Sequence, residues 1–246
     1  MYLTTRGLVL RVTDYNDKDC LLTLLTPENG KLTVKARGLR RKNSPLIAPC
    51  QLLAYGDFTL FEYRGSYTIN EAASVELFQA LRRDLTKLSL GTYFAQVAEL
   101  LSQEDLPNPE ILSLVLNCLY MLTTETPENK IKAVFEFRIA CLAGFMPDLT
   151  GCHGCGNELA TLFNLSAGAL LCDKCRNLTS GGIRLPISAG TLHALQYIAY
   201  CEPKKLFSFD LGYENLDQLS QITEAYLTTQ LERGFSTLDF YKSLFI

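Results

Sequence analysis

Over roughly the first 76 residues, hydrophobic and polar positions alternate in short runs that turn-forming residues interrupt. Alternation with a period of two residues is typical of half-buried strands. The segments PENG (27–30) and RGS (64–66) are strong turn signals. The runs predict five strands, at residues 8–15, 20–26, 31–37, 50–63 and 67–75. Five short strands, each adjacent to the next, predict a small barrel of the OB kind.

After Val75 the pattern changes to a helical period. Leu81, Leu85 and Leu88 mark one helix face, and the almost wholly apolar run 93–101 is typical of a helix buried in a bundle.

Cap residues predict where the next helices begin and end. Asn108–Pro109 and Thr126–Pro127 are start signals, and Gly144 suits the position that follows a helix. Two more helices are expected, one opened by Ser188 and one that carries apolar residues across 216–226.

These patterns predict an α+β, multidomain chain. We expect an OB-fold nucleic-acid-binding domain at 1–77 and an α-helical domain at 78–246 that contains a zinc-binding segment at 148–180. No uncharged run is both long enough and free of helix breakers to cross a bilayer, and no signal peptide is recognisable, so we expect a cytoplasmic protein.

Four of the nine cysteines follow the spacing C-x₂-C-x₁₆-C-x₂-C: Cys152, Cys155, Cys172 and Cys175. Each C-x₂-C turn directs two sulfurs to one point, and two such turns complete a tetrahedral thiolate shell for Zn²⁺. Short strands between the pairs would give a zinc ribbon. A closed Cys₄ shell leaves no position for substrate, which indicates one structural zinc per chain.

Other interpretations of this segment are less consistent with the spacing. Redox dithiols usually need one C-x₂-C beside a helix rather than two facing pairs. His153 lies inside the first knuckle, where its side chain points away when both flanking sulfurs bind, so we leave it out of the shell.

Candidate catalytic residues are scarce. The chain has two histidines, and it lacks both the P-loop and the G-x-G-x-x-G pattern. Paired carboxylates near QEDL (103–106) are more simply explained by a solvated helix end. We therefore expect a binding protein, although an enzyme with a carboxylate site that leaves no motif is an alternative.

Charge is distributed unevenly along the chain. The net charge is −3, but residues 1–77 carry ten Lys and Arg against eight Asp and Glu, while the remainder carries thirteen against eighteen. One stretch accounts for most of the local excess, with six cations and no acid: Lys31, Lys35, Arg37, Arg40, Arg41 and Lys42. Such a density is stable when the charges stay hydrated or face an anion.

The strand period assigns these cations to one side of the barrel. Leu32, Val34 and Ala36 should point inward and the residues between them outward, while Gly38 and Pro45 bound a basic loop. A basic strand and its loop form the kind of track by which OB barrels follow a nucleic-acid backbone. A merely solvated face is the alternative. Candidate stacking aromatics are Tyr15, Phe61 and Tyr63, each of which could equally belong to the core.

Three segments in this order resemble the RecO family of bacterial DNA repair proteins: TRGLVLRV, then LLTLLTPENGKLTVKARGLRRKNS, then AGFMPDLTGCHGCG with a later LLCDKC. The basic stretch and the cysteines are the most specific parts of this resemblance, and the helices match only in pattern. In this family the DNA-contacting strand and loop correspond to the six cations above.

The resemblance implies a recombination mediator of the RecF pathway. Members bind single- and double-stranded DNA, anneal complementary strands, act with RecR, engage the tail of single-stranded DNA-binding protein and help to load RecA. Such a protein would be associated with the nucleoid. The competing interpretation is a zinc-ribbon adaptor in transcription or RNA processing, and strand annealing separates the two.

A partner site follows from the same resemblance. The tail of single-stranded DNA-binding protein is acidic with apolar end residues, so its site needs a groove beside cations. Lys130, Lys132 and Arg138 are the basic residues best placed for this role, with an ordinary solvated helix face as the alternative. The sequence departs from the family near its C-terminus, where Ser236 and Thr237 stand in place of a Lys-Ser pair.

Overall fold

The computed structural model describes residues 1–177 and 182–245. The chain divides into two compact units. The first comprises Met1–Glu125 together with Phe235–Ile246, and the second comprises Thr126–Gly234. No helix among the described residues is long and apolar enough to cross a membrane.

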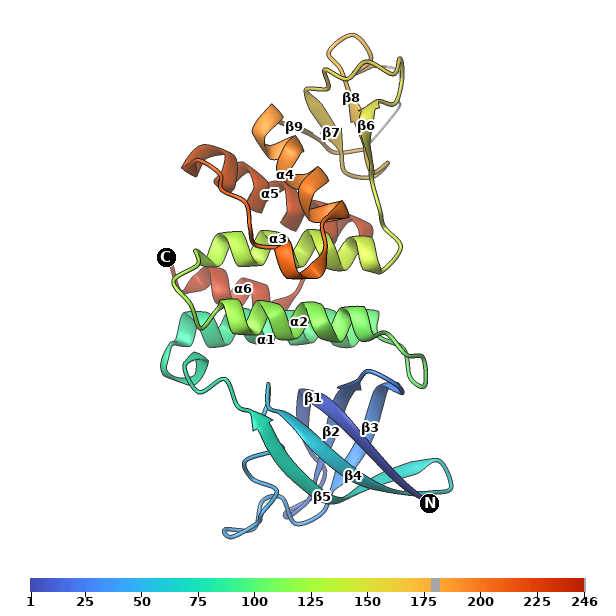
Figure 1. Ribbon diagram of the computed structural model, residues 1–246, viewed down its shortest axis with the longest axis vertical. Coiled ribbons are helices and arrows are strands. Elements are labelled where there is room, and N and C mark those ends of the chain that lie inside the picture. The colour runs from blue at the N-terminus through green and yellow to red at the C-terminus, as the bar shows by residue number, and fades with distance from the viewer. Residues whose placement is uncertain (178–181, 246) are drawn as a thin grey trace. The chain divides into compact units, whose positions relative to one another are not determined.

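Five strands in the first unit close into a barrel, which confirms the predicted OB-like architecture. They are β1 (Tyr2–Asp14), β2 (Cys20–Thr26), β3 (Gly30–Ala36), β4 (Tyr55–Tyr63) and β5 (Ser66–Glu76). The strands run around the barrel in the order β1-β2-β3-β5-β4, and β4 closes it against β1 (Figure 1). The expectation that each strand pairs with the next is therefore wrong for β3 and β4, because β5 lies between them in a parallel pairing with β3.

Two strand boundaries differ from the sequence pattern. β1 begins at Tyr2 rather than near Leu8, because its first half pairs with β4 and its second half with β2. β4 begins at Tyr55 rather than Cys50, because the chain before it turns, with Leu53 in the left-handed region at φ 63°. A continuous apolar run does not by itself distinguish a strand from a buried turn.

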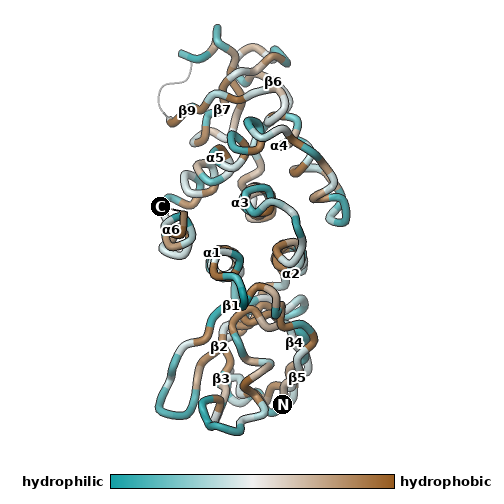
Figure 2. The backbone as a smooth tube through the Cα atoms, turned by 90° about the vertical axis from the view of Figure 1, so that its left-hand side faces the viewer, coloured by the Kyte–Doolittle hydropathy of each residue, from teal (hydrophilic) through white to brown (hydrophobic). Residues whose placement is uncertain are grey.

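Alternation along β3 produces the predicted division of its side chains. Leu32, Val34 and Ala36 are buried in the barrel core with residues such as Phe58 and Leu60. Figure 2 shows this concentration of hydrophobic residues along the strands, whereas the loops at one end of the barrel are mostly hydrophilic.

Helices α1 (Leu85–Leu101), α2 (Pro109–Met121) and α6 (Ser236–Ser243) belong to the same unit as the barrel. The predicted start at Asn108 is confirmed, since its side chain accepts a hydrogen bond from the backbone N–H of Ile111. Helix α6 packs on α1, where Thr237 bonds to Gln96. The compact units thus divide the chain elsewhere than at residue 77. The boundary between 77 and 78 stays a prediction, because compactness does not show which part folds alone.

The second unit packs three helices beside a small sheet. Helices α3 (Glu128–Leu142), α4 (Ala189–Tyr200) and α5 (Tyr213–Gln230) form the bundle. The sheet has the order β6-β8-β7-β9, with β6 (Asp148–Cys152), β7 (Leu162–Asn164), β8 (Ala169–Leu171) and β9 (Arg184–Pro186). Two sequence signals hold here: Ser188 caps α4, and Gly144 after α3 has φ 94°.

Candidate nucleic-acid interface and metal centre

The loop after β3 is organised by hydrogen bonds from its own backbone and from the β1–β2 connection. Gly38 takes φ 67°, and its N–H donates to Oδ1 of Asp19 at 2.8 Å. The N–H of Arg41 then donates to the carbonyl of Gly38, and that of Ser44 to the carbonyl of Arg41. These successive turns give residues 38–44 a defined path, so the cations are carried on an ordered loop.

Asp19 is held as a carboxylate by the same contacts. The Gly38 N–H, the Asn16 side chain and the ammonium of Lys35 all lower the pKa of Asp19, in that order of importance. The Asp19–Lys35 pair spans 3.3 Å, and the Lys35 ammonium also lies 4.3 Å from the centre of the Tyr15 ring. Lys35 is thus half-buried against residues of the β1–β2 connection.

The six predicted cations fall into two groups. Three have partners within the unit: Lys31 donates to the carbonyl of Glu99 at 3.0 Å, Lys35 pairs with Asp19, and Arg40 pairs with Asp14 at 2.7 Å. The other three, Arg37, Arg41 and Lys42, are exposed, and their head groups form no ion pair with any residue in 1–177 or 182–245. The free charge is therefore concentrated on the loop.

Lys31 lies apart from this loop. It stands at the opposite end of β3, about 20 Å from Arg37 at the rise of an extended strand. Its backbone N–H donates to the carbonyl of Gln103, next to the end of α1. Arg40 differs again, because both it and Asp14 are largely exposed, and an exposed pair of this kind contributes about 0–1 kcal/mol. Arg40 can leave Asp14 for a phosphate at little cost.

The acidic partners Asp14 and Asp19 were missed by the sequence analysis. The signal was present in the segment TDYNDKD, which carries three acids at the end of β1 and in its connection to β2. Asp14 pairs with Cys20, and Cys20 in turn with Ala36, so the barrel register brings this connection beside the end of β3.

Of the three candidate stacking aromatics, only Tyr15 lies beside the basic loop, where Lys35 covers its ring. Phe61 and Tyr63 are on β4, which β5 separates from β3. Phe61 pairs with the ring of Tyr2 at 5.4 Å between centroids, and Tyr63 stacks with Arg64. All three rings are exposed, so none belongs to the core.

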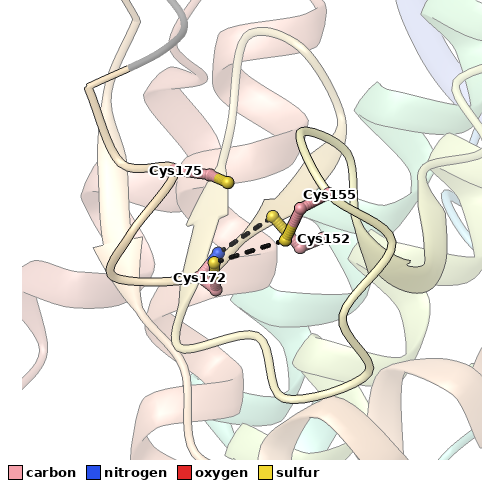
Figure 3. A group of neighbouring side chains, drawn as sticks. All are labelled: Cys152, Cys155, Cys172 and Cys175. Atoms are coloured by element: carbon pink, nitrogen blue, oxygen red, sulfur yellow. Dashed lines mark hydrogen bonds between the residues drawn. The ribbon is translucent and has the colours of Figure 1, made fainter.

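The four predicted cysteines meet in the second unit. Cys152 ends β6, Cys172 follows β8, and the two knuckles bring all four sulfurs within 4.8 Å of one another. Figure 3 shows the four side chains turned toward a common centre. Zn–S bonds of about 2.3 Å in a tetrahedron place sulfurs about 3.8 Å apart, and the Cys155 and Cys172 sulfurs are 3.8 Å apart. The residues present therefore fit a tetrahedral metal ion.

Electrostatics in this cluster also favour a cation. Burial opposes ionisation of Cys152, but the backbone N–H groups of Cys172, Gly154 and Cys155 stabilise its thiolate and lower its pKa to about 6. The sulfur of Cys155, then burial, raises the pKa of Cys175 to about 12. Four thiolates this close need a positive ion between them, because a bound metal deprotonates thiols that otherwise keep their protons.

The immediate surroundings of the cluster agree with a structural role. Three of the four cysteines are buried, and only Cys155 is exposed. His153 is exposed, and its side chain is not part of the group. Strands β7 and β8 pair antiparallel between the knuckles, as a ribbon requires. Residues 178–180 of the predicted 148–180 segment lie outside the described residues.

The three cations proposed for a partner site use their head groups within the second unit. Lys132 is 4% exposed and pairs with Glu136 at 3.0 Å and Glu224 at 2.8 Å. Burial disfavours its ammonium, but these two carboxylates outweigh burial and raise the pKa of Lys132. Lys132 can reach a partner only if α3 and α5 separate.

Lys130 and Arg138 bind backbone carbonyls. Lys130 donates to the carbonyls of Phe207 and Phe209, and Arg138 to those of Ile198 and Ala199 at the end of α4. The alternative interpretation, an ordinary solvated helix face, therefore does not describe these three positions, and their assignment to a partner stays a prediction.

Comparison with known proteins covers nearly the whole chain. The family model described as "Recombination protein O N terminal" matches residues 1–78, and "Recombination protein O C terminal" matches residues 82–239. A protein of Acetivibrio thermocellus named "DNA repair protein RecO" is 33% identical over 99% of this chain and 97% of its own length.

Relatives of the same name occur in Alkaliphilus metalliredigens and Bacillus subtilis. The first is 28% identical over 99% of this chain and 100% of its own length. The second is 28% identical over 92% of this chain and 88% of its own length. Both family models match this chain. Its structure has a barrel with a basic loop, a helical remainder and a four-cysteine cluster. The chain belongs to the RecO family.

Proposed function

We propose that this protein is a recombination mediator of the RecF pathway that binds DNA through the loop after β3. Membership of the RecO family supports a role in DNA repair and recombination. The observation that carries the finer proposal is the basic loop itself, in which Arg37, Arg41 and Lys42 are exposed without an ion-pair partner among the described residues.

Cations without protein partners are available to phosphates. Each one that contacts DNA releases a condensed counterion, which makes binding favourable at low salt and independent of base sequence. Arg40 joins them at the cost of its exposed pair with Asp14. Lys35 and Lys31, which have partners inside the unit, position the strand rather than supply free charge.

The proposal includes single- and double-stranded DNA as ligands and the annealing of complementary strands. It also includes RecR, the tail of single-stranded DNA-binding protein and, indirectly, RecA as partners. These follow from what the family resemblance implies. We assign no chemical step to the chain and regard it as a binding protein.

Zinc is the metal that we propose for the cysteine cluster. Four thiolates in a tetrahedral arrangement suit Zn²⁺ better than harder ions, which prefer oxygen ligands. The segment around the knuckles has a small core of its own, in which Cys152, Leu171, Cys172 and Cys175 are the buried members. Metal binding would then supply free energy of folding to this segment.

Elemental analysis of the reduced, purified protein tests the metal assignment. We expect one zinc per chain, and loss of zinc together with destabilisation of the second unit in Cys172→Ser. Cys118→Ser is a control, because it also removes a buried thiol but belongs to the first unit and is not one of the four cluster cysteines. A folded parent protein that contains no zinc would contradict the assignment.

Annealing of strands coated with single-stranded DNA-binding protein tests the function. The parent should anneal them, and the variant Arg37→Ala, Arg41→Ala, Lys42→Ala should lose most of this activity. A matched variant removes three exposed cations elsewhere: Arg64→Asn, Arg83→Ala and Lys204→Ala. Asn is chosen at residue 64 because φ there is 51°, which Asn tolerates.

The two variants lose the same charge, so they separate the loop from net charge. Equal annealing by parent and loop variant would contradict the proposed DNA track. Equal loss in both variants would show that only overall charge matters.

A further inference from the structure

A hollow of about 400 Å³ opens beside the basic loop where two strands of the barrel separate. Strands β3 and β5 pair in parallel only at Val34–Tyr67 and Lys35–Thr68. Beyond these pairs β3 ends at Ala36 and the chain leaves the barrel wall, whereas β5 continues through Ile69 and Asn70. The hollow lies between the departing loop and β5, so barrel topology creates it.

Its lining combines cations, carboxamides and an apolar floor. Arg37 and Arg41 contribute guanidinium groups, and Asn43 and Asn70 contribute exposed carboxamides. Leu46 and Ile69, together with Pro45, supply apolar surface, and no acidic side chain lines the hollow. The volume lies in the range of about 300–1,000 Å³ that is common for small-ligand sites.

The Arg41 side chain lies against Gly38, the residue at which the basic loop begins. A Cβ at Gly38 would lie 3.2 Å from both Cδ and Nε of Arg41, which shows that the arginine lies across the bare backbone of Gly38. The φ of 67° at Gly38 independently favours glycine. A side chain at residue 38 would therefore contact the arginine, whereas glycine leaves room for it beside the hollow.

This combination of groups matches one nucleotide. A guanidinium plane can stack on a base or bind a phosphate, and apolar side chains pack on the base face. A carboxamide both donates and accepts, so it can bond the edge of any base. Those edges are paired and stacked inside a duplex, and a base must be unstacked to enter such a pocket.

We propose that this hollow receives a single unstacked base of the DNA strand that follows the basic loop, and that it makes the protein prefer single strands to duplex. The inference rests on the proposed function, because the loop must first bind the backbone. Arg37 and Arg41 then serve both backbone and base, whereas Asn43 and Asn70 serve the base alone.

The two asparagines allow the pocket to be tested separately from the track. The variant Asn43→Ala, Asn70→Ala keeps every cation and changes only exposed side chains, so it should fold like the parent. A matched variant, Gln79→Ala, Gln103→Ala, removes two exposed carboxamides elsewhere in the same unit. Three labelled probes are used: a single strand with its bases, an abasic strand with the same number of phosphates, and a duplex of the same sequence.

We expect the parent and the glutamine variant to bind the base-bearing strand about tenfold more tightly than the abasic strand, which is the effect of one well-held base. In the asparagine variant this ratio should fall clearly below that of the parent, because the bonds to the base edge are lost while the guanidinium groups and the apolar floor remain. Its affinity for the abasic strand and for the duplex should be unchanged. A parent without preference for bases, or an asparagine variant that keeps the full ratio, would overturn the inference.

Failure of the proposed function would give binding results different from those of a failed base pocket. If the variant Arg37→Ala, Arg41→Ala, Lys42→Ala binds all three probes like the parent, the track itself is wrong, and the base pocket fails with it. If that variant weakens on all three probes while the asparagine variant keeps its ratio, the track stands and only the pocket is rejected.

Discussion

Two groups of three cations in this protein have opposite environments. Arg37, Arg41 and Lys42 on the loop after β3 are exposed and form no ion pair with the described residues. The group on α3, formed by Lys130, Lys132 and Arg138, turns its head groups to carboxylates and carbonyls of the second unit.

The difference follows from where each group lies in the chain. A loop has no repeating face, so its cations stay in water unless an acid is brought beside them, as Asp14 is beside Arg40. A helix buried on several sides offers its cations only internal partners, and a charge there is stable only when paired. Cations of the first kind can serve a ligand, whereas those of the second kind serve the fold.

The largest expected effect is on the helical group. Lys132→Met leaves the fully buried carboxylate of Glu136 without its ammonium, so the free energy of unfolding should fall by about 3–5 kcal/mol in urea unfolding. The double variant Lys132→Met, Glu136→Leu removes the buried pair and leaves only the partly exposed Glu224 without its ammonium, so it should recover most of the loss. Equal stability of parent and single variant would show that this charge is not needed by the fold.

The loop group should respond in binding and not in stability. Replacing Arg37, Arg41 and Lys42 by Ala should lower DNA affinity at every sequence. Each phosphate contact on a single strand contributes about 0.7 to the slope of log K against log salt, so the loss of three contacts should flatten this slope by about 2. The free energy of unfolding should change by less than about 0.5 kcal/mol, as for most surface changes. An unchanged slope would place these cations with ordinary solvated charges.

A smaller stability effect is expected at Arg138. Its guanidinium binds the carbonyls of Ile198 and Ala199, which are among the last carbonyls of α4 and have no partner within that helix. Arg138→Met should therefore cost about 1–2 kcal/mol in thermal or urea unfolding. Arg83→Met, at an exposed arginine whose side chain forms no hydrogen bond with any described residue, is the control and should cost almost nothing. DNA affinity of the folded Arg138 variant should match the parent.

The smallest expected effect comes from releasing one cation, Arg40, from its ion pair with Asp14. Asp14→Asn releases Arg40, so single-strand affinity should rise a few-fold and the salt slope should steepen by up to about 0.7. Asp57→Asn removes the same charge but releases Arg6, which pairs with Asp57 between β1 and β4. A rise of the same size in both variants would indicate a general charge effect and not a released Arg40.

Local patterns in the sequence determined much of this protein. The two residues between the cysteines of each pair predicted two tight turns, each of which brings two sulfurs together. Alternation along β3 predicted which side chains are buried, and cap residues such as Asn108 and Ser188 predicted helix starts. Each of these signals depends on residues only a few positions apart.

Tertiary structure alone decided which charges are available. The pairing of β3 with β5, the approach of Asp14 and Asp19 to the basic loop, and the burial of Lys132 between α3 and α5 all join residues distant in sequence. No local pattern specifies such partners, because the energy of a charge depends on what surrounds it in three dimensions. The sequence therefore determined where the cations are, and the fold determined which of them have protein partners among the described residues.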